Sequence, residues 1–305
     1  MAISNIPTVK AKSIVYKNQS PSEWFGTDYS MNIYRGCNHG CIYCDSRSDC
    51  FKVDNFDTVK PKENALQIIR DDLRRKAKVG VIGTGAMSDP YNHLEKDLKL
   101  TRNALELINA FGFGISLCTK SPLVARDIDV LRDIQSHSPV NVMFSITMAD
   151  DNLCKKIEPY VPPTSQRFEA IRALSEQGIF CGVLMMPILP FISDNKENIV
   201  KVLHMAKDAG ANFVYASMGM TLRHGSREYY YDKLDTVLPD MAGIREKYQK
   251  RYGNKYNCSS PNYKKLWATF NEECEKLELL YDMRAIVQGY KGGYGNKQIT
   301  LDDMV

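Results

Sequence analysis

The sequence predicts an α/β fold, a partial (β/α)6 TIM-like barrel with a mainly helical C-terminal extension. Short apolar runs alternate with amphipathic segments six times between residues 29 and 217. The apolar runs are nearly continuous, which is typical of parallel strands that are covered on both faces. We therefore expect a lead-in at residues 1–28, a barrel at residues 29–220 and an extension at residues 221–305 that packs on the barrel.

The predicted strands are short and apolar, and each predicted helix has one apolar face. We place the strands at residues 29–34, 79–82, 113–118, 140–146, 179–186 and 212–217. We place the helices at residues 62–77, 94–111, 122–136, 164–177 and 194–209. In a barrel of this kind the chemistry lies at the carboxyl ends of the strands. The residues that directly follow each predicted strand are therefore the first candidates for a site.

The lead-in and the extension have weaker patterns. Residues 1–28 indicate irregular structure, and residues 262–281 indicate an amphipathic helix. The segment from Gly289 to Gly295 is flexible by composition. Residues 223–265 hold ten Lys/Arg and five Asp/Glu, interleaved with seven tyrosines. Such a stretch can follow phosphates and stack bases, or it can be a solvated face with tyrosines in the core.

The composition bounds the class of protein. Hydrophobic residues make up 44% and charged residues 25%, and the net charge is +4. This charge is too small to indicate a nucleic-acid partner by itself. There is no apolar run long enough to cross a membrane and no secretory signal pattern at the N-terminus, so we expect a cytoplasmic protein with no membrane partner. We expect no disulfide framework among the nine cysteines.

Three cysteines, Cys37, Cys41 and Cys44, lie close together beside Gly36 and Gly40. Glycine allows the backbone to turn tightly around a ligand. Thiolates are soft ligands, and closely spaced cysteines on one loop are how a chain holds an iron–sulfur cluster. Three thiolates cannot ligate all four irons of a 4Fe-4S cluster. One iron would therefore be open to a ligand that is not cysteine.

A structural zinc site is the alternative, with His39 or Cys50 as the fourth ligand. Zinc sites of this kind usually pair two knuckles that are far apart in the sequence. No second knuckle is present in this sequence. On this alternative the protein is a non-catalytic nucleic-acid-binding module that zinc or a cluster stabilises, and a metal assay separates the two interpretations.

The C-x3-C-x2-C spacing, with Tyr43 just before the third cysteine, resembles the signature of radical S-adenosylmethionine (SAM) enzymes. The resemblance implies a 4Fe-4S cluster on Cys37, Cys41 and Cys44, with SAM bound to the open iron. It implies reductive cleavage of SAM to a 5′-deoxyadenosyl radical that abstracts hydrogen from a substrate. It also implies an electron donor such as flavodoxin or ferredoxin as a partner.

Further stretches resemble the spore photoproduct lyase-like branch of that superfamily, a branch of DNA repair enzymes. They are Gly83–Tyr91 with Glu95, Thr119–Ile128, Phe144–Thr147, Ile157–Pro159, Arg167 and Pro187–Pro190. Ala86 stands where the lyase has its hydrogen-donor cysteine, and Asp45 stands where the lyase has a tyrosine. The cofactor chemistry therefore carries over, but thymine-dimer reversal by that hydrogen relay does not. Tyr91 is the candidate substitute donor.

The same stretches supply candidate SAM contacts. Lys120, at a strand end, offers a positive charge to the SAM carboxylate, and Ser145 offers a hydroxyl to the ribose or carboxylate. Ser88 and Asp89 offer acceptors to the SAM amino group, and Tyr43 would pack against adenine. Each has a structural alternative. Lys120 can be a surface lysine, and the hydroxyl of Ser145 can bond to the backbone. Ser88 and Asp89 can form a turn before Pro90, and Tyr43 can simply fill the loop.

The leading hypothesis is a lyase-like radical SAM enzyme that abstracts hydrogen from a nucleic-acid base. A second hypothesis keeps the cofactor and has a peptide or protein as substrate. A dedicated second cluster would favour that hypothesis, but the remaining cysteines have no second cluster motif.

Overall fold

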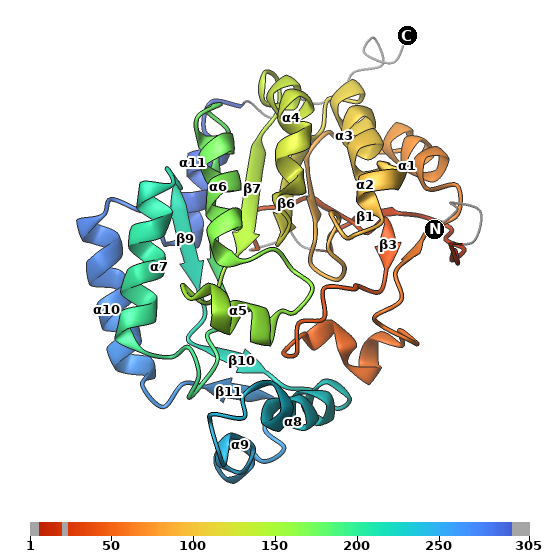
Figure 1. Cartoon of the computed structure of the whole chain (residues 1–305). Helices are drawn as coiled ribbons and strands as arrows, with labels where there is room; N and C mark the ends of the chain where they lie inside the picture. Colours follow the sequence, from red (N-terminus) through yellow and green to blue (C-terminus); the bar gives the residue numbers. More distant parts are fainter. Residues whose placement is uncertain (1–5, 20–23, 295–305) are drawn as a thin grey trace.

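The computed structural model describes residues 6–19 and 24–294 (Figure 1). A seven-stranded sheet lies at its centre, in the order β1-β2-β5-β6-β7-β8-β9. Its strands are β1 (Val15–Lys17), β2 (Tyr29–Met31), β5 (Val81–Thr84), β6 (Gly114–Thr119), β7 (Val140–Ser145), β8 (Cys181–Met185) and β9 (Phe213–Ala216). Neighbours from β2 to β9 run parallel, and β1 pairs antiparallel with β2. All six predicted strands are present, so the predicted fold is confirmed.

Helices cover the outer face of the sheet, as α4, α6 and α7 do in the front of Figure 1. The helices between the strands are α1 (Ala65–Arg74), α2 (Glu95–Leu98), α3 (Leu100–Ala110), α4 (Ile128–Gln135), α5 (Asp151–Ile157), α6 (Thr164–Ser175) and α7 (Lys196–Asp208). The predicted helix at 94–111 is divided at Lys99, which has a φ of +50°. The 3₁₀ helix η4 (Pro122–Asp127) opens the next predicted helix. No helix in the described ranges is both long and apolar enough to cross a membrane.

The lead-in is more ordered than its composition indicates. Residues Val15–Lys17 form the edge strand β1, so the prediction of irregular structure is wrong there. The carboxylate of Asp72, on α1, accepts hydrogen bonds from the backbone N–H groups of Ile14 (2.6 Å) and Val15 (2.9 Å). A buried acceptor far along the chain therefore fixes this strand.

The inner, concave face of the sheet is filled by both ends of the chain. Phe25, from the segment before β2, packs with Phe213 of β9 and with Ile286. Ile286 belongs to α11 (Met283–Lys291), which lies behind the strands in Figure 1. Part of the predicted flexible segment, Gly289–Lys291, is therefore helical, whereas its last residue lies outside the described ranges.

The extension forms a small layer at one end of the barrel. This layer contains β10 (Gly219–Thr221), β11 (Asn257–Ser259), α8 (Ser226–Val237) and α9 (Ile244–Tyr252), and β10 pairs antiparallel with β11. The next helix of the extension, α10 (Tyr263–Lys276), packs beside α7 (Figure 1). Four tyrosines of the extension are buried in one cluster: Tyr230, Tyr231, Tyr248 and Tyr252. These four are core residues, which contradicts a base-stacking role for them. Tyr256 and Tyr263 are 43% and 47% exposed.

Candidate functional site

The cysteine loop, residues 36–44, joins β3 (Tyr34–Arg35) to the 3₁₀ helix η2 (Asp45–Arg47). It needs glycine at two places. Gly36 has a φ of +80°, and a Cβ there would lie 2.6 Å from the carbonyl oxygen of Thr58. Gly40 has a φ of +70°, and a Cβ there would lie 2.6 Å from the ring of Tyr160. Both positions combine a backbone conformation that favours glycine with a close approach.

All three loop cysteines are free thiols. Cys41 is buried, whereas Cys37 and Cys44 are partly exposed. Burial, and then the charge of Asp89, raises the pKa of Cys37 to about 11. Burial also raises the pKa of Cys41. Metal loading must therefore displace protons from these thiols, as it does at thiolate sites in general.

The geometry does not favour a single metal ion. Within the described residues, no group of three or more His, Cys, Asp and Glu side chains lies close enough to hold one ion. A cluster of four irons needs its thiolates further apart than one ion does. The two residues considered as a fourth zinc ligand have other contacts: His39 Nδ1 lies 3.5 Å from Asp89, and exposed Cys50 lies 3.4 Å from Arg223 Nη1.

Asp89 links three segments of the site. Its Oδ1 accepts hydrogen bonds from Thr119 Oγ1 (2.7 Å) and from the N–H of Tyr91 (2.8 Å). Its Oδ2 accepts from the N–H of Lys120 (2.7 Å) and faces His39 of the cysteine loop. The carboxylate therefore holds the end of β6 against the cysteine loop.

Ser88 acts on the same loop, because its hydroxyl donates to the carbonyl oxygen of Gly36. The structure thus engages the side chains of Ser88 and Asp89 with protein groups. Both residues lie close to the cysteines, and their contacts position the cysteine loop.

Tyr43 is buried, and its hydroxyl donates to Glu158 Oε1. The other oxygen of Glu158 accepts from Arg167 Nη2, and both of these side chains are 0% exposed. Arg167 Nη1 also donates to the carbonyl oxygen of Ser145 at 2.9 Å. A buried ion pair therefore connects the cysteine loop to the end of β7. The sequence places Glu158 and Arg167 among the stretches that resemble the lyase-like branch, but it gives neither a role, because only the fold brings them to Tyr43.

Lys120 lies over the ring of Tyr43, with Nζ 5.8 Å from the ring centroid. Burial alone would lower the pKa of Lys120, but Cys41 in its deprotonated form and the carboxylate of Glu158 outweigh burial and raise it. No residue of the described ranges forms a hydrogen bond or ion pair with its Nζ. The site therefore holds a charged lysine that faces the cysteine loop.

Hydroxyl and thiol groups follow on the neighbouring strands. Ser145 Oγ lies 3.5 Å from Cys118 Sγ on β6. Two residues after Ser145, the buried Thr147 Oγ1 has no hydrogen-bond partner among the described residues. A cation such as Lys120 suits the carboxylate of a ligand, and the unpartnered hydroxyl of Thr147 suits its hydroxyl groups. These residues therefore fit SAM beside the three thiols.

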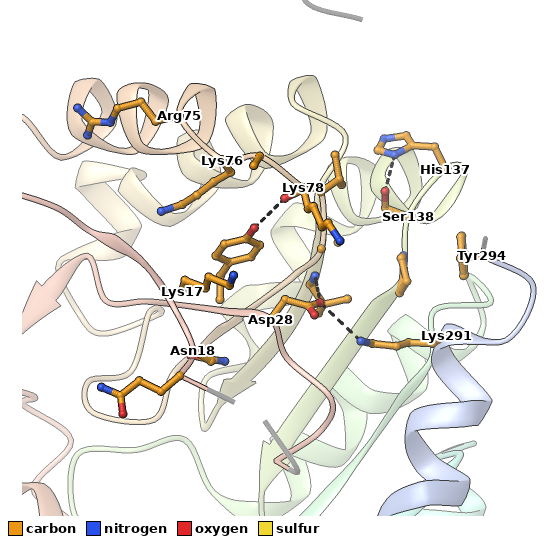
Figure 2. Close-up of a pocket in the computed structure, with 18 residues that line it drawn as sticks. Lys17, Asn18, Asp28, Arg75, Lys76, Lys78, His137, Ser138, Lys291 and Tyr294 are labelled. Atoms are coloured by element: carbon orange, nitrogen blue, oxygen red, sulfur yellow. Dashed lines mark hydrogen bonds and ion pairs between the residues drawn. The ribbon is translucent and has the colours of Figure 1, made fainter. Parts of the chain in front are cut away.

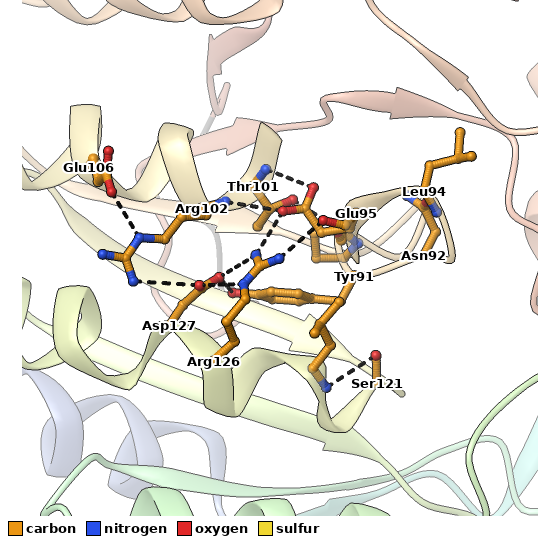
Figure 3. Close-up of polar contacts among 12 residues, drawn as sticks. Tyr91, Asn92, Leu94, Glu95, Thr101, Arg102, Glu106, Ser121, Arg126 and Asp127 are labelled. Carbon is orange, nitrogen blue, oxygen red and sulfur yellow. Dashed lines mark hydrogen bonds and ion pairs between the residues drawn. The ribbon is translucent and has the colours of Figure 1, made fainter. Parts of the chain in front are cut away.

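Tyr91 does not join this group (Figure 3). Its ring is 1% exposed, and its hydroxyl donates to Asp127 Oδ2 at 2.9 Å. Arg126 connects Asp127 to Glu95 with contacts of 2.8 and 2.9 Å. Burial, and then the charge of Asp127, raises the pKa of Tyr91. This network ties α2 to η4, so the structure does not support Tyr91 as a hydrogen donor.

A cavity of about 960 Å³ lies at the opposite end of the strands (Figure 2). Lys17, Lys78 and Lys291 line it together with Asp28, and Gly114 marks the amino end of β6 there. None of the candidate site residues lies in this cavity.

A family model described as the radical SAM superfamily matches residues 31–203. An uncharacterised protein of Mycobacterium tuberculosis is 30% identical over 230 residues, which are 73% of this chain and 67% of that protein. An uncharacterised protein of Methanocaldococcus jannaschii is 35% identical over 195 residues, 63% of this chain and 71% of that protein.

Solved structures of low identity share the fold. A mutant of spore photoproduct lyase has a TM-score of 0.65 at 15% identity, and the match covers 89% of this chain and 78% of that one. The lyase complexed with dinucleoside spore photoproduct has a TM-score of 0.61 at 16% identity, covering 82% and 74%. A radical SAM methyltransferase of Kitasatospora setae, with tryptophan and a SAM analogue bound, has a TM-score of 0.53 at 13% identity, covering 81% and 51%.

Proposed function

The chain belongs to the radical SAM superfamily, and from that membership we propose an enzyme that binds a 4Fe-4S cluster and SAM and abstracts hydrogen from a substrate. Cys37, Cys41 and Cys44 would hold the cluster. The observation that carries the proposal is the position of Lys120, a partly buried cation that follows β6 and lies over the ring of Tyr43 in the cysteine loop. When bound, the cluster and SAM supply a carbon radical that removes a hydrogen atom from the substrate.

The residues of this chain would bind and orient the cofactor. Lys120 would hold the carboxylate of SAM by charge, and Ser145 and Thr147 would offer hydroxyl groups at the end of β7. Tyr43 offers a flat ring face whose position is fixed by its hydrogen bond to Glu158. Because Tyr43, Ser145 and Thr147 are buried, water would be excluded around the reacting atoms.

For the substrate, we propose a nucleic-acid base or its modified form. Support comes from the likeness in fold to the lyase structure that holds a dinucleoside. The reaction would differ from that of the lyase in its hydrogen return, because Ala86 has no side chain that donates hydrogen. Cys118, next to Ser145, is a thiol that sequence reasoning did not single out.

Anaerobic reconstitution with iron and sulfide tests the proposal. After reduction by dithionite in the presence of SAM, we expect 5′-deoxyadenosine from the native chain and none from Cys37→Ala, Cys41→Ala or Cys44→Ala. Cys50→Ala is the matched control, because Cys50 is exposed and outside the loop, and it should keep both the cluster absorbance and the product. Bound zinc without iron–sulfur absorbance in the native chain would contradict the proposal.

A further inference from the structure

Side chains on the inner face of the sheet lie in layers that the strand register defines. Ser145 of β7 pairs with Leu184 of β8, and Leu184 pairs with Tyr215 of β9. Side chains of paired residues point to the same face. Lys120 follows the β6 residue that pairs with Phe144, so it is level with Ser145. Tyr215 therefore lies in the same layer as two of the candidate SAM contacts.

The layer beneath Tyr215 is closed. Met143 and Phe213 pack there with Phe25 and with Ile286 of α11, and all four side chains are at most 3% exposed. Phe25 also contacts Tyr215 itself, with ring centroids 5.6 Å apart. Nothing larger than a water molecule fits among close-packed side chains of this kind. The layer that holds Tyr215 is consequently the first one above this closed core, on the side of Lys120 and Ser145.

Trp24 extends this layer. Its ring lies edge-on against Tyr215, with centroids 5.7 Å apart and an interplanar angle of 87°. It is 43% exposed, although it sits directly on the buried Phe25. We call Trp24 and Tyr215 the aromatic wall. An exposed indole held rigidly by two other rings presents a flat apolar surface at low entropic cost.

We infer that the aromatic wall contacts the substrate and stacks a flat unsaturated ring, such as a nucleobase, at the level of Lys120 and Ser145. The inference rests on the proposed function and names the side chains that would select the substrate. Aromatic side chains stack bases without a preference for one base, because every base has a π face. A saturated or strongly charged group would gain little from this wall.

The chain contains two tryptophans, so fluorescence can report on one of them. Trp267, on α10, is the other, and its buried Nε1 has no hydrogen-bond partner among the described residues. Trp267→Phe therefore leaves Trp24 as the single reporter and should keep native SAM cleavage. The reconstituted protein is titrated with SAM present, first with a four-residue oligothymidylate and then with an abasic oligonucleotide of the same length. We expect quenching by the first and none by the second.

Affinity variants complete the test. Tyr215→Leu and Trp24→Leu should each weaken oligothymidylate binding by about fivefold to 150-fold, which is the range for loss of one stacked base. Tyr215→Phe should keep the native affinity, which shows that the fold tolerates a change there. Tyr256→Leu is the matched control, because Tyr256 is as exposed as Trp24 but lies in the extension. Its affinity should be native.

The outcomes separate the two proposals. If the native chain cleaves SAM but binds both oligonucleotides equally, or neither, the aromatic wall does not stack bases and the inference is overturned. Native affinity in both leucine variants would overturn it as well. If the native chain neither assembles a cluster nor cleaves SAM, the proposed function itself has failed.

Discussion

The hydroxyl of Tyr43 donates a hydrogen bond to Glu158, a residue 115 positions later in the chain. Tyr43 directly precedes the third cysteine, and Glu158 directly follows α5. Because Glu158 is also paired with buried Arg167, the orientation of the tyrosine depends on an ion pair inside the barrel. The cysteine loop is thus held to the core by charge as well as by packing.

Breaking this ion pair should cost more than removing the tyrosine hydroxyl. Glu158→Gln leaves the guanidinium of Arg167 buried without a counter-charge, and we expect the free energy of unfolding to fall by about 3–5 kcal/mol. Tyr43→Phe removes one hydrogen bond to a charged acceptor, and we expect a fall of about 1.5–3 kcal/mol. Urea unfolding of the two variants measures both values. Equal losses would show that the ion pair adds nothing beyond the tyrosine contact.

Lys120 should control SAM affinity without controlling the cluster. Lys120→Met keeps the length of the side chain and removes the charge, so we expect SAM to bind about tenfold more weakly or worse. The iron content and cluster absorbance should be native. Lys156→Met is the control, because Lys156 is an exposed lysine on α5. Equilibrium dialysis with labelled SAM gives the affinities, and native affinity in Lys120→Met would remove this lysine from the site.

The strands and the cysteine loop could be predicted because their signals are local. Each buried parallel strand is a continuous apolar run, and the loop is recognised by the spacing of its cysteines and by the glycines beside them. The partners of Tyr43 could not be predicted, because Glu158 and Arg167 meet it only through the fold. The burial of Phe25 could not be predicted either, because the lead-in around it is largely polar, yet its side chain is 0% exposed.

The interleaved tyrosines of the extension left two roles open in the sequence, because a phenol ring can line a core as well as a surface. Tyr230 and Tyr248 satisfy their hydroxyls by bonding to each other at 2.9 Å inside the cluster. Tyr91 shows the same ambiguity at the barrel, where its partner is Asp127. The sequence identifies such tyrosines as candidates for a functional role, and their burial in the structure shows which of them are core residues.

The extension should stabilise the barrel and not merely adjoin it. Phe270 of α10 is 0% exposed and belongs to the main core cluster. Phe270→Ala should lower the free energy of unfolding by about 3–5 kcal/mol, because it removes a large buried side chain. Tyr263→Ala, on the same helix but 47% exposed, should change it by less than about 0.5 kcal/mol. Equal values in thermal or urea unfolding would mean that α10 is not part of the barrel core.

Asp72 should make the edge of the sheet sensitive to acid. Burial alone would raise the pKa of Asp72, but hydrogen bonds from Ile14, Val15 and Ser13 outweigh it and lower the pKa. A carboxyl group with a lowered pKa in the folded state stabilises that state fully above its unfolded pKa, about pH 4. The stabilisation is lost as the pH falls through the folded value.

Asp72→Asn keeps one acceptor oxygen but removes the negative charge that strengthens the bonds to Oδ2, and it should cost about 1–3 kcal/mol at pH 7. The cost should shrink below about pH 4, because the native carboxyl group then loses its charge as well. Asp71→Asn is the control, since Asp71 is the adjacent carboxylate and bonds the exposed side chain of Gln67. Urea midpoints measured from pH 7 down to pH 3 give both curves. A cost for Asp72→Asn that stays constant over this range would show that charge plays no part in holding β1, because only a charged acceptor makes the contact depend on pH.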